Sequence, residues 1–194
     1  MHVMHGETGW IEVICGPMFS GKSEELIRRI RRAAIARQPL QIFKPKIDAR
    51  YHETRIVSHS EQAIEATPVS SSADIARLTL PTTRVLGVDE VQFFDAGIVE
   101  VAERFAAAGM RIILAGLDQD YTGKPFEPVP QLLCVAEYVT KTLAICNRCG
   151  APAGRSQRMA GGAERVLVGA ADAYEPRCRR CHSPRAEPAT GDLF

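Results

Sequence analysis

Short apolar runs alternate with segments of helical periodicity along most of the chain. The runs at residues 11–15, 40–44, 85–88 and 111–115 have the length and apolar character of buried strands. Residues 139–144 predict a last core strand. Between them, apolar residues recur at helical spacing in two longer segments, which contain Leu26, Ile27, Ile30, Ala33 and Ala34, and Ile98, Val99, Ala102, Phe105 and Ala106. This alternation predicts an α/β fold with a mostly parallel sheet, helices on both faces, and ligands at the carboxyl ends of the strands.

Weaker signals complete the predicted elements. Residues 64–69 predict a short edge strand, because they include a proline, which cannot donate to a central ladder. Ser72 predicts the N-cap of a short helix, and Asp95 that of the second longer helix. Residues 131–137 predict one more short helix.

Residues 16–23 read GPMFSGKS and fit the phosphate-binding pattern G-x-x-x-x-G-K-[ST]. In this motif the glycines let backbone amides turn toward phosphate oxygens, Lys22 reaches the β and γ phosphates, and the Ser23 hydroxyl binds Mg²⁺. A coincidental match is the alternative, but the predicted strand before it and helix after it supply the context that the motif requires. The sequence therefore predicts a phosphate loop made of Gly16, Pro17, Met18, Phe19, Ser20, Gly21, Lys22 and Ser23.

The apolar run at residues 85–88 ends in the acidic pair Asp89 and Glu90. An aspartate at the carboxyl end of a strand beside a phosphate loop can hold Mg²⁺ against the β and γ phosphates. Glu90 is a candidate general base for a hydroxyl or water that attacks the γ-phosphate. Capping of the next turn is the alternative role of this pair, and the phosphate loop upstream favours the chemical one. Phe93 and Phe94 follow, and adjacent aromatics at a strand end are more typical of a core than of a ligand contact.

Composition excludes several classes of protein. The chain has 194 residues and a net charge of +1, so no overall basic field predicts binding to nucleic acid or to an anionic membrane. We expect the cluster of Arg28, Arg29, Arg31 and Arg32 to form the solvated face of the first helix. No run approaches the ~20 apolar residues of a membrane span, and residues 1–8 lack a signal-peptide core. The simplest expectation is a cytoplasmic enzyme.

Four of the six cysteines form two C-x-x-C pairs, Cys146 with Cys149 and Cys178 with Cys181. Two such pairs predict a closed, structural zinc site, with a redox role as the weaker alternative. His182 could replace Cys181 as the fourth ligand. Cys15 and Cys134 lie in apolar runs and are expected to be small buried hydrophobes. The predicted organisation is a core at residues 1–145, a zinc domain at 146–185 and a disordered tail at 186–194.

The phosphate loop, the run VDEVQFF at residues 88–94, the run AGLDQDYTGKPF at 115–126 and the cysteine pairs together resemble the zinc-containing thymidine kinases of the human cytosolic and bacterial type. The resemblance covers residues 9–182 and is closest to Gram-positive members. It implies a P-loop NTPase-like, RecA-like core that transfers the ATP γ-phosphate to the 5′-hydroxyl of thymidine or deoxyuridine. It further implies homodimers or homotetramers, inhibition by thymidine triphosphate, and a part in pyrimidine salvage for DNA synthesis.

The resemblance also assigns roles to particular residues. Glu90, Lys22 and Arg50 are the implied catalytic residues, and Ser23 and Asp89 the implied magnesium ligands. ATP is expected at residues 16–23 together with Asp89, Glu90, Val91 and Gln92. The nucleoside is expected under a lasso loop at residues 165–174, against Met18, Phe93, Tyr121, Phe126, Val168, Gly169, Ala170 and Tyr174.

Two other readings remain open from the sequence. A nucleotide kinase of the adenylate kinase kind also uses cysteine pairs, but its zinc lid is inserted in the middle of the chain. An ATP-driven nucleic-acid-binding protein could use the zinc domain as its DNA contact, since that domain carries Arg148, Arg155, Arg158, Arg165, Arg177, Arg179 and Arg180. The nearly neutral overall charge weakens this reading.

Overall fold

The computed structural model describes residues 8–47, 55–57, 63–159 and 173–183 of the chain. Its centre is a six-stranded sheet in the order β5-β2-β6-β7-β1-β8. All neighbouring strands in it are parallel, which confirms the predicted α/β fold. These strands are β1 (Trp10–Cys15), β2 (Leu40–Pro45), β5 (Thr67–Val69), β6 (Val85–Val88), β7 (Arg111–Gly116) and β8 (Tyr138–Lys141).

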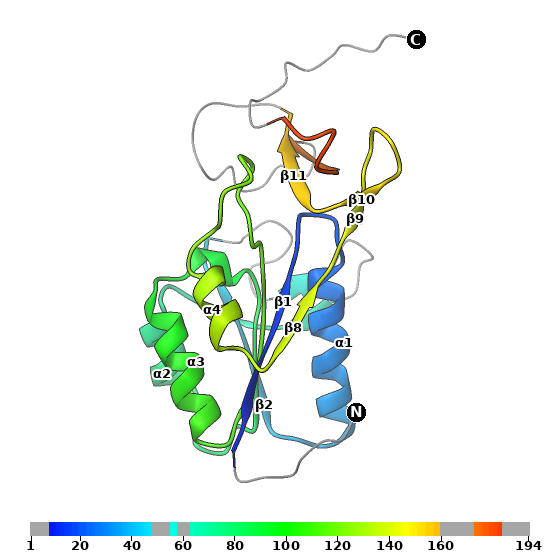
Figure 1. The fold of residues 1–194 in the computed structure, drawn as a ribbon. Coiled ribbons are helices and arrows are strands. Elements are labelled where there is room, and N and C mark those ends of the chain that lie inside the picture. The colour runs from blue at the N-terminus through cyan, green and yellow to red at the C-terminus, as the bar shows by residue number, and fades with distance from the viewer. Residues whose placement is uncertain (1–7, 48–54, 58–62, 160–172, 184–194) are drawn as a thin grey trace.

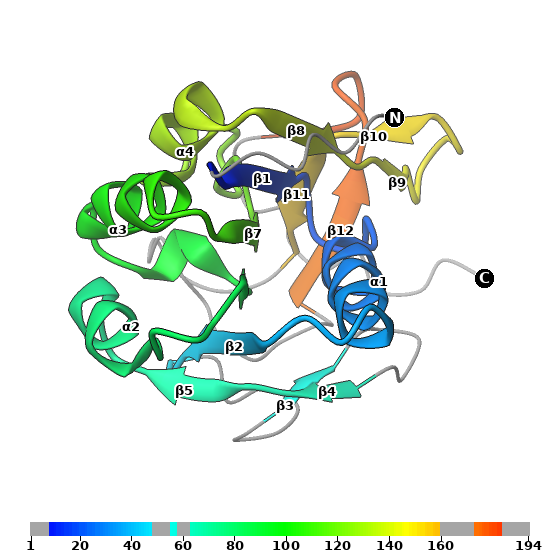
Figure 2. The ribbon, with the colours of Figure 1, turned by 90° about the horizontal axis from the view of Figure 1, so that it is seen from below.

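Helices cover both faces of the sheet, as predicted (Figures 1 and 2). One face carries α1 (Lys22–Ile35), and the other carries α2 (Ser72–Leu78), α3 (Gly97–Ala107) and α4 (Val129–Val135). Successive side chains of a strand point to opposite faces. In β7, Ile112 and Leu114 accordingly join the core beneath α2, α3 and α4, while Ile113 and Ala115 pack with α1. The runs that form β1, β6 and β7 are therefore buried on both sides, which is why they lack polar alternation, whereas the edge strand β8 is mostly exposed.

Small antiparallel hairpins surround this sheet. One pairs β3 (Arg55–Val57) with β4 (Ala63–Glu65), a second pairs β9 (Ala144–Ile145) with β10 (Pro152–Ala153), and a third pairs β11 (Arg155–Arg158) with β12 (Tyr174–Arg177). The second and third lie beyond the carboxyl ends of the sheet strands, at the top of Figure 1. We call residues 144–159 and 173–183 the cysteine module. None of the helices in the described ranges has the length and apolar character needed to cross a bilayer.

The cap of α2 differs from the prediction. Ser71 occupies the N-cap position, and its hydroxyl accepts a hydrogen bond from the amide of Asp74 at 3.2 Å. Ser72 is buried instead, and its hydroxyl donates to the Asp95 carboxylate at 2.5 Å. Asp95 also accepts from the Gly97 amide at 3.0 Å, although α3 formally begins after Ala96. Ser71 is therefore the cap, because the hydroxyl of Ser72 is used in the contact with Asp95 beside the start of α3.

Some predicted element boundaries were also wrong. The run at residues 139–144 divides into β8 and β9, which belong to different sheets. The run at residues 64–69 divides into β4 and β5, and β5 forms the edge of the main sheet as expected. The helix predicted at 131–137 is α4, which begins two residues earlier because proline is tolerated in the first turn. Cys134 lies on the exposed side of α4, so its predicted burial was wrong, whereas Cys15 is buried.

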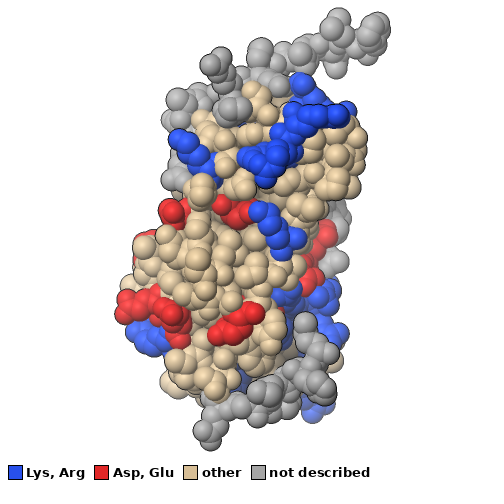
Figure 3. Space-filling view, viewed as in Figure 1, with Lys and Arg blue, Asp and Glu red and all other residues tan. Residues whose placement is uncertain are grey.

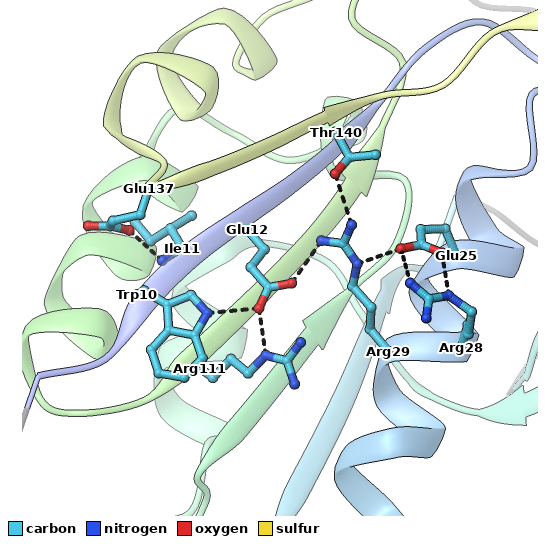
Figure 4. Close-up of polar contacts among 9 residues, drawn as sticks. All are labelled: Trp10, Ile11, Glu12, Glu25, Arg28, Arg29, Arg111, Glu137 and Thr140. Atoms are coloured by element: carbon cyan, nitrogen blue, oxygen red, sulfur yellow. Dashed lines mark hydrogen bonds and ion pairs between the residues drawn. The ribbon is translucent and has the colours of Figure 1, made fainter. Parts of the chain in front are cut away.

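A buried acidic side chain ties the first strand to its neighbours (Figure 4). Glu12 of β1 is 6% exposed and accepts hydrogen bonds from Trp10 Nε1 at 2.8 Å and Arg111 Nε at 2.6 Å. Its second oxygen pairs with Arg29 Nη1 at 2.7 Å. Burial opposes ionisation of Glu12, but the hydrogen bonds from Arg111 and Trp10 outweigh it, so the pKa of this carboxyl is lowered.

Arg29 is the exception to the solvated arginine face predicted for α1. Its guanidinium is largely buried, and besides Glu12 it contacts Glu25 Oε1 at 2.8 Å and Thr140 Oγ1 at 2.9 Å. Arg28, Arg31 and Arg32 are exposed, as expected. The helical periodicity turns Arg29 toward β1 and β8, where Glu12 provides the negative charge that stabilises it.

Candidate active site

The phosphate loop leaves the end of β1 and enters α1 at Lys22, as predicted. Three of its residues have positive φ: Gly16 at 144°, Phe19 at 63° and Gly21 at 81°. A Cβ on Gly16 would lie 2.4 Å from the Thr142 carbonyl oxygen, so only glycine fits there. Gly21 is the N-cap residue and has no side chain to occupy the amides of the first turn. This is the geometry of an anion site at a helix N-terminus.

The Lys22 amine points back into the loop that precedes it. Its Nζ donates to the Pro17 carbonyl oxygen at 2.6 Å, and the residue is only 9% exposed. The Ser20 hydroxyl donates to the same carbonyl at 2.7 Å. The charge that the motif places near phosphate is therefore held within the loop, close to where the phosphates are expected.

The structure brings together the two residues that the sequence proposed as magnesium ligands. Ser23 Oγ donates to Asp89 Oδ2 at 3.0 Å, and Asp89 is 5% exposed. The other carboxylate oxygen accepts from the Glu90 amide at 3.0 Å. A hydroxyl and a carboxylate are oxygen donors of the kind that Mg²⁺ takes beside nucleotide phosphates, so these residues fit that ion.

Glu90 is held in an uncommon backbone conformation, with φ at 51°. Its Oε2 accepts a hydrogen bond from Gln92 Nε2, and Gln92 Oε1 accepts from the Leu117 amide at 3.0 Å. Gln92 is 3% exposed, so its side chain lies behind Glu90 rather than at the surface. Gly116 leaves room for it, since a Cβ there would lie 2.6 Å from Gln92 Oε1. Gln92 thus orients Glu90, a role that the sequence did not reveal.

Several predicted nucleoside-pocket residues lie near one another. The rings of Phe93 and Phe126 meet edge to face, with centroids 6.2 Å apart. The Arg158 guanidinium lies 3.9 Å from the centroid of the Tyr121 ring and donates to the Tyr174 hydroxyl. Arg158 is 1% exposed and links these two aromatic residues. The remaining predicted residues Arg50, Val168, Gly169 and Ala170 fall outside the described part of the chain.

The ligand atoms of Cys146, Cys149, Cys178 and Cys181 lie within 4.8 Å of one another. Cys149 Sγ is 3.6 Å from the sulfur atoms of both Cys178 and Cys181. A tetrahedral site with Zn–S bonds of about 2.3 Å requires sulfur atoms about 3.8 Å apart, so these four thiols fit zinc. His182 Nε2 donates to the Tyr121 carbonyl oxygen at 2.9 Å, and His182 lies outside the cluster.

The cysteine module contacts the phosphate loop directly. Phe19 packs against the small core formed by Ala144, Cys146, Ala153 and Cys178. The Met18 amide donates to Ser156 Oγ at 3.0 Å, and Ser156 is 4% exposed. The sequence did not reveal the roles of Ser156, Arg158 and Thr142. The contacts of Ser156 and Thr142 join segments more than a hundred residues apart, and Arg158 links Tyr121 to Tyr174 of the neighbouring strand. Their only local signal is polarity within short strand-like segments.

The arginines of the cysteine module do not form one exposed face. Arg158 and Arg177 are buried, at 1% and 2% exposure, and serve contacts within the protein. Arg148, Arg179 and Arg180 are exposed. Figure 3 shows Lys and Arg side chains at the upper end of the molecule, with acidic side chains below them. Burial of part of the arginine set weakens the reading of this module as a DNA contact.

Comparison with known proteins agrees with this geometry. The family model described as "Thymidine kinase" matches residues 9–182. A protein of Rhodothermus sp. (strain ITI 518) named "Thymidine kinase" is 57% identical over 188 residues, which are 97% of this chain and 88% of the relative. A protein of the same name from Bdellovibrio bacteriovorus is 53% identical over 184 residues, covering 95% of this chain and 90% of the relative.

Proposed function

The chain belongs to the thymidine kinase family, and from this we propose that it transfers the γ-phosphate of ATP to the 5′-hydroxyl of thymidine. The products are ADP and thymidine monophosphate. The observation that carries the proposal is the contact of Ser23 with Asp89, next to Glu90 and at the mouth of the phosphate loop. Phosphoryl transfer needs a phosphate cradle, a cation site and a proton acceptor, and these features lie together here.

The phosphate loop binds the triphosphate through the backbone amides at residues 16–23. Lys22 exchanges the Pro17 carbonyl for the β and γ phosphates, where its charge stabilises the transferring group. Ser23 and Asp89 would hold Mg²⁺, which neutralises charge on the same phosphates when bound. The buried side chains of Val91 and Gln92 leave their backbone as the part that can face the nucleotide.

Glu90 accepts the proton of the thymidine 5′-hydroxyl as that oxygen attacks the γ-phosphorus. The bond between the γ-phosphorus and the oxygen that bridges it to the β-phosphate breaks, and ADP is the leaving group. The proton remains on the Glu90 carboxylate until the products leave. Gln92 supports this role because its amide holds one oxygen of the Glu90 carboxylate in place. Arg50, which lies outside the described residues, is the proposed additional contact to phosphate.

The thymine base is proposed to lie between Phe93, Phe126, Tyr121 and Tyr174, with Met18 on the side of the phosphate loop. Residues 165–174 are proposed to cover the base and read its edge through the backbone, which suits thymidine and deoxyuridine and excludes purines. Thymidine triphosphate is proposed to inhibit, because it carries both the base and a phosphate chain.

The proposal extends to the organisation of the protein. Residues 1–145 form the kinase core and residues 146–185 a zinc domain, in which Zn²⁺ is structural because four thiolates close its coordination shell. Residues 186–194 form a tail. The enzyme acts in the cytoplasm as a homodimer or homotetramer and supplies thymidine monophosphate to DNA synthesis by salvage.

A panel of acceptors tests the proposed function. Purified enzyme is given MgATP with thymidine, deoxyuridine, deoxycytidine, deoxyadenosine, thymidine monophosphate or AMP, with and without thymidine triphosphate. We expect phosphorylation of thymidine and deoxyuridine alone, and inhibition by the triphosphate. Phosphorylation of only a monophosphate would overturn the choice of acceptor, and an unchanged rate in Lys22→Ala would overturn the ATP site.

A further inference from the structure

A pair of hydroxyl groups joins the phosphate loop to the segment that leads into the cysteine module. Thr142 follows β8 directly and precedes β9. Its Oγ1 lies 2.8 Å from Ser20 Oγ and 3.0 Å from the Cys15 carbonyl oxygen. The Gly16 backbone lies against the same residue, since a Cβ on Gly16 would be 2.7 Å from Thr142 Oγ1. Thr142 therefore touches both the start and the middle of the loop.

Only two hydroxyl protons are available for the three contacts that Thr142 and Ser20 make. The contacts run from the Cys15 carbonyl through Thr142 and Ser20 to the Pro17 carbonyl, and only the two hydroxyls supply protons for them. The Cys15 carbonyl already accepts from the Thr142 amide at 2.8 Å. The Thr142 hydroxyl is within reach of both the Cys15 carbonyl and Ser20. When it donates to Ser20, the Cys15 carbonyl keeps the Thr142 amide and the Ser20 proton points to Pro17.

This arrangement matters when Lys22 moves. In the structure the Pro17 carbonyl accepts from both Lys22 and Ser20. If Lys22 turns to the phosphates, as the proposed function requires, Ser20 becomes the donor that keeps this carbonyl hydrogen-bonded. Loss of a hydrogen bond to a carbonyl in such a site is costly. The Thr142 hydroxyl holds the Ser20 hydroxyl in the orientation that prevents this loss.

We propose that Thr142 is a positioning residue for ATP binding, which acts through Ser20 to support the loop once Lys22 has left the Pro17 carbonyl. This inference rests on the proposed function, because it assumes that Lys22 engages the phosphates of ATP. The segment between β8 and β9 would then contribute to the affinity for ATP. Thymidine is proposed to contact this loop only through Met18, so its binding should change much less than that of ATP.

Thr142→Val and Thr142→Ser distinguish the effect of the hydroxyl from the effect of side-chain shape. Valine keeps the size and branching but removes the proton, and serine keeps the hydroxyl. We expect Thr142→Val to raise KM for ATP about fivefold, the effect of one neutral hydrogen bond. KM for thymidine and kcat should remain near wild type, because the loop is held equally in the ground and transition states. Thr142→Ser should restore most of the ATP affinity.

Two further measurements keep the inference falsifiable. Thr83→Val is the matched control, since Thr83 is buried and donates to Gln41 Oε1 at 2.6 Å at the amino end of the sheet. It should leave both KM values unchanged. Ser20→Ala tests the contact from the other side, and adding Thr142→Val to it should raise KM for ATP no further.

Equal changes in both KM values, or additive effects of the Ser20 and Thr142 substitutions, would overturn the role of Thr142. A Thr142→Ser protein that folds normally but has the weak ATP affinity of Thr142→Val would also overturn this role. Thymidine phosphorylation by the wild-type enzyme tests the proposed function independently. Binding of a fluorescent ATP analogue, measured without acceptor, reports the Thr142 effect even if the acceptor differs from thymidine.

Discussion

Glu90 combines a positive φ with a carboxylate that is fixed from behind by a buried amide. A glutamate in the left-handed region is uncommon, and such strain is maintained when the surrounding contacts determine it. Here the Gln92 side chain spans from Glu90 to the backbone of Leu117. The carboxylate is therefore positioned before any substrate arrives, which favours its use in proton transfer.

Replacement of Glu90 by glutamine should reduce turnover by roughly 10²–10⁴, because a general base is lost while the shape of the side chain is retained. Binding of ATP, measured with a fluorescent analogue, should stay close to wild type. Glu103→Gln is a suitable control, since Glu103 is exposed on α3 and distant from the loop. A Glu90→Gln enzyme with near-normal turnover would require a different proton acceptor.

At the scale of single residues, the sequence predicts best where the local motif determines the backbone. The phosphate loop is such a case, because its glycines and its lysine act through their positions in a continuous segment. The roles of Gln92, Ser156 and Thr142 could not be predicted in this way. Each depends on a contact with a segment that only the tertiary fold brings near, such as Leu117 or the phosphate loop.

Among the elements, α1 depends on charge as well as on its apolar face. Glu25 in its first turn pairs with Arg28 and Arg29, and Arg29 continues to Glu12 of β1 (Figure 4). Hydrogen bonds from Arg28, and then from Arg29, overcome partial burial and lower the pKa of Glu25 from 4.5 to about 2. Glu25 is thus an ionised link between the helix that follows the phosphate loop and the strand that precedes it.

The stability of the protein should depend on the charge of Glu25 at low pH. A carboxyl with a lowered pKa stabilises the fold above its ordinary value of 4.5, and this contribution is lost as the pH falls from 4.5 toward 2. Urea unfolding at several pH values between 6 and 3 should therefore show a shallower loss of stability in Glu25→Gln than in wild type. Glu24→Gln removes one charge from the same turn and provides the comparison. Identical slopes for all three proteins would contradict this role of Glu25.

Element type and order followed from periodicity, whereas the positions of charged residues did not. The strands β1, β2, β6 and β7 and the two longer helices were predicted correctly, because burial on both faces of a parallel sheet produces nearly uninterrupted apolar runs. The prediction that all four arginines of α1 face solvent was wrong for Arg29, since Glu12 lies within an otherwise apolar strand. The split of residues 139–144 into β8 and β9 was missed because no glycine or proline marks a break there, and only the fold separates the two strands.

The whole molecule has two parts that meet at the phosphate loop. Phe19 packs on the cysteine cluster, and Met18 donates to Ser156 of the same module. The sheet supplies the other side of the loop through β1 and α1. Nucleotide affinity should therefore respond to the integrity of the cysteine module.

Loss of a metal from the cysteine cluster should weaken the binding of ATP. We expect Cys149→Ser, or treatment with a chelator, to weaken binding of a fluorescent ATP analogue by roughly fivefold or more, since contacts to Met18 and Phe19 loosen. The melting temperature should fall by roughly 5 °C or more. Cys134→Ser provides the control, because Cys134 is exposed on α4 and outside the cluster. A stable, metal-free protein with unchanged ATP affinity would show that the module is independent of the loop.

The order of strands in the sheet also has a consequence for how the protein is made. β1 lies between β7 and β8, so the strand of this sheet that is synthesised first pairs, within the sheet, with residues 111–116 and 138–141. At ordinary rates of translation of about 5–20 residues per second, β1 waits roughly 5–20 s for its first neighbour. The segment that carries the phosphate loop is thus synthesised early and paired late. Its apolar side chains therefore stay without a partner strand for longer than those of any other strand of this sheet.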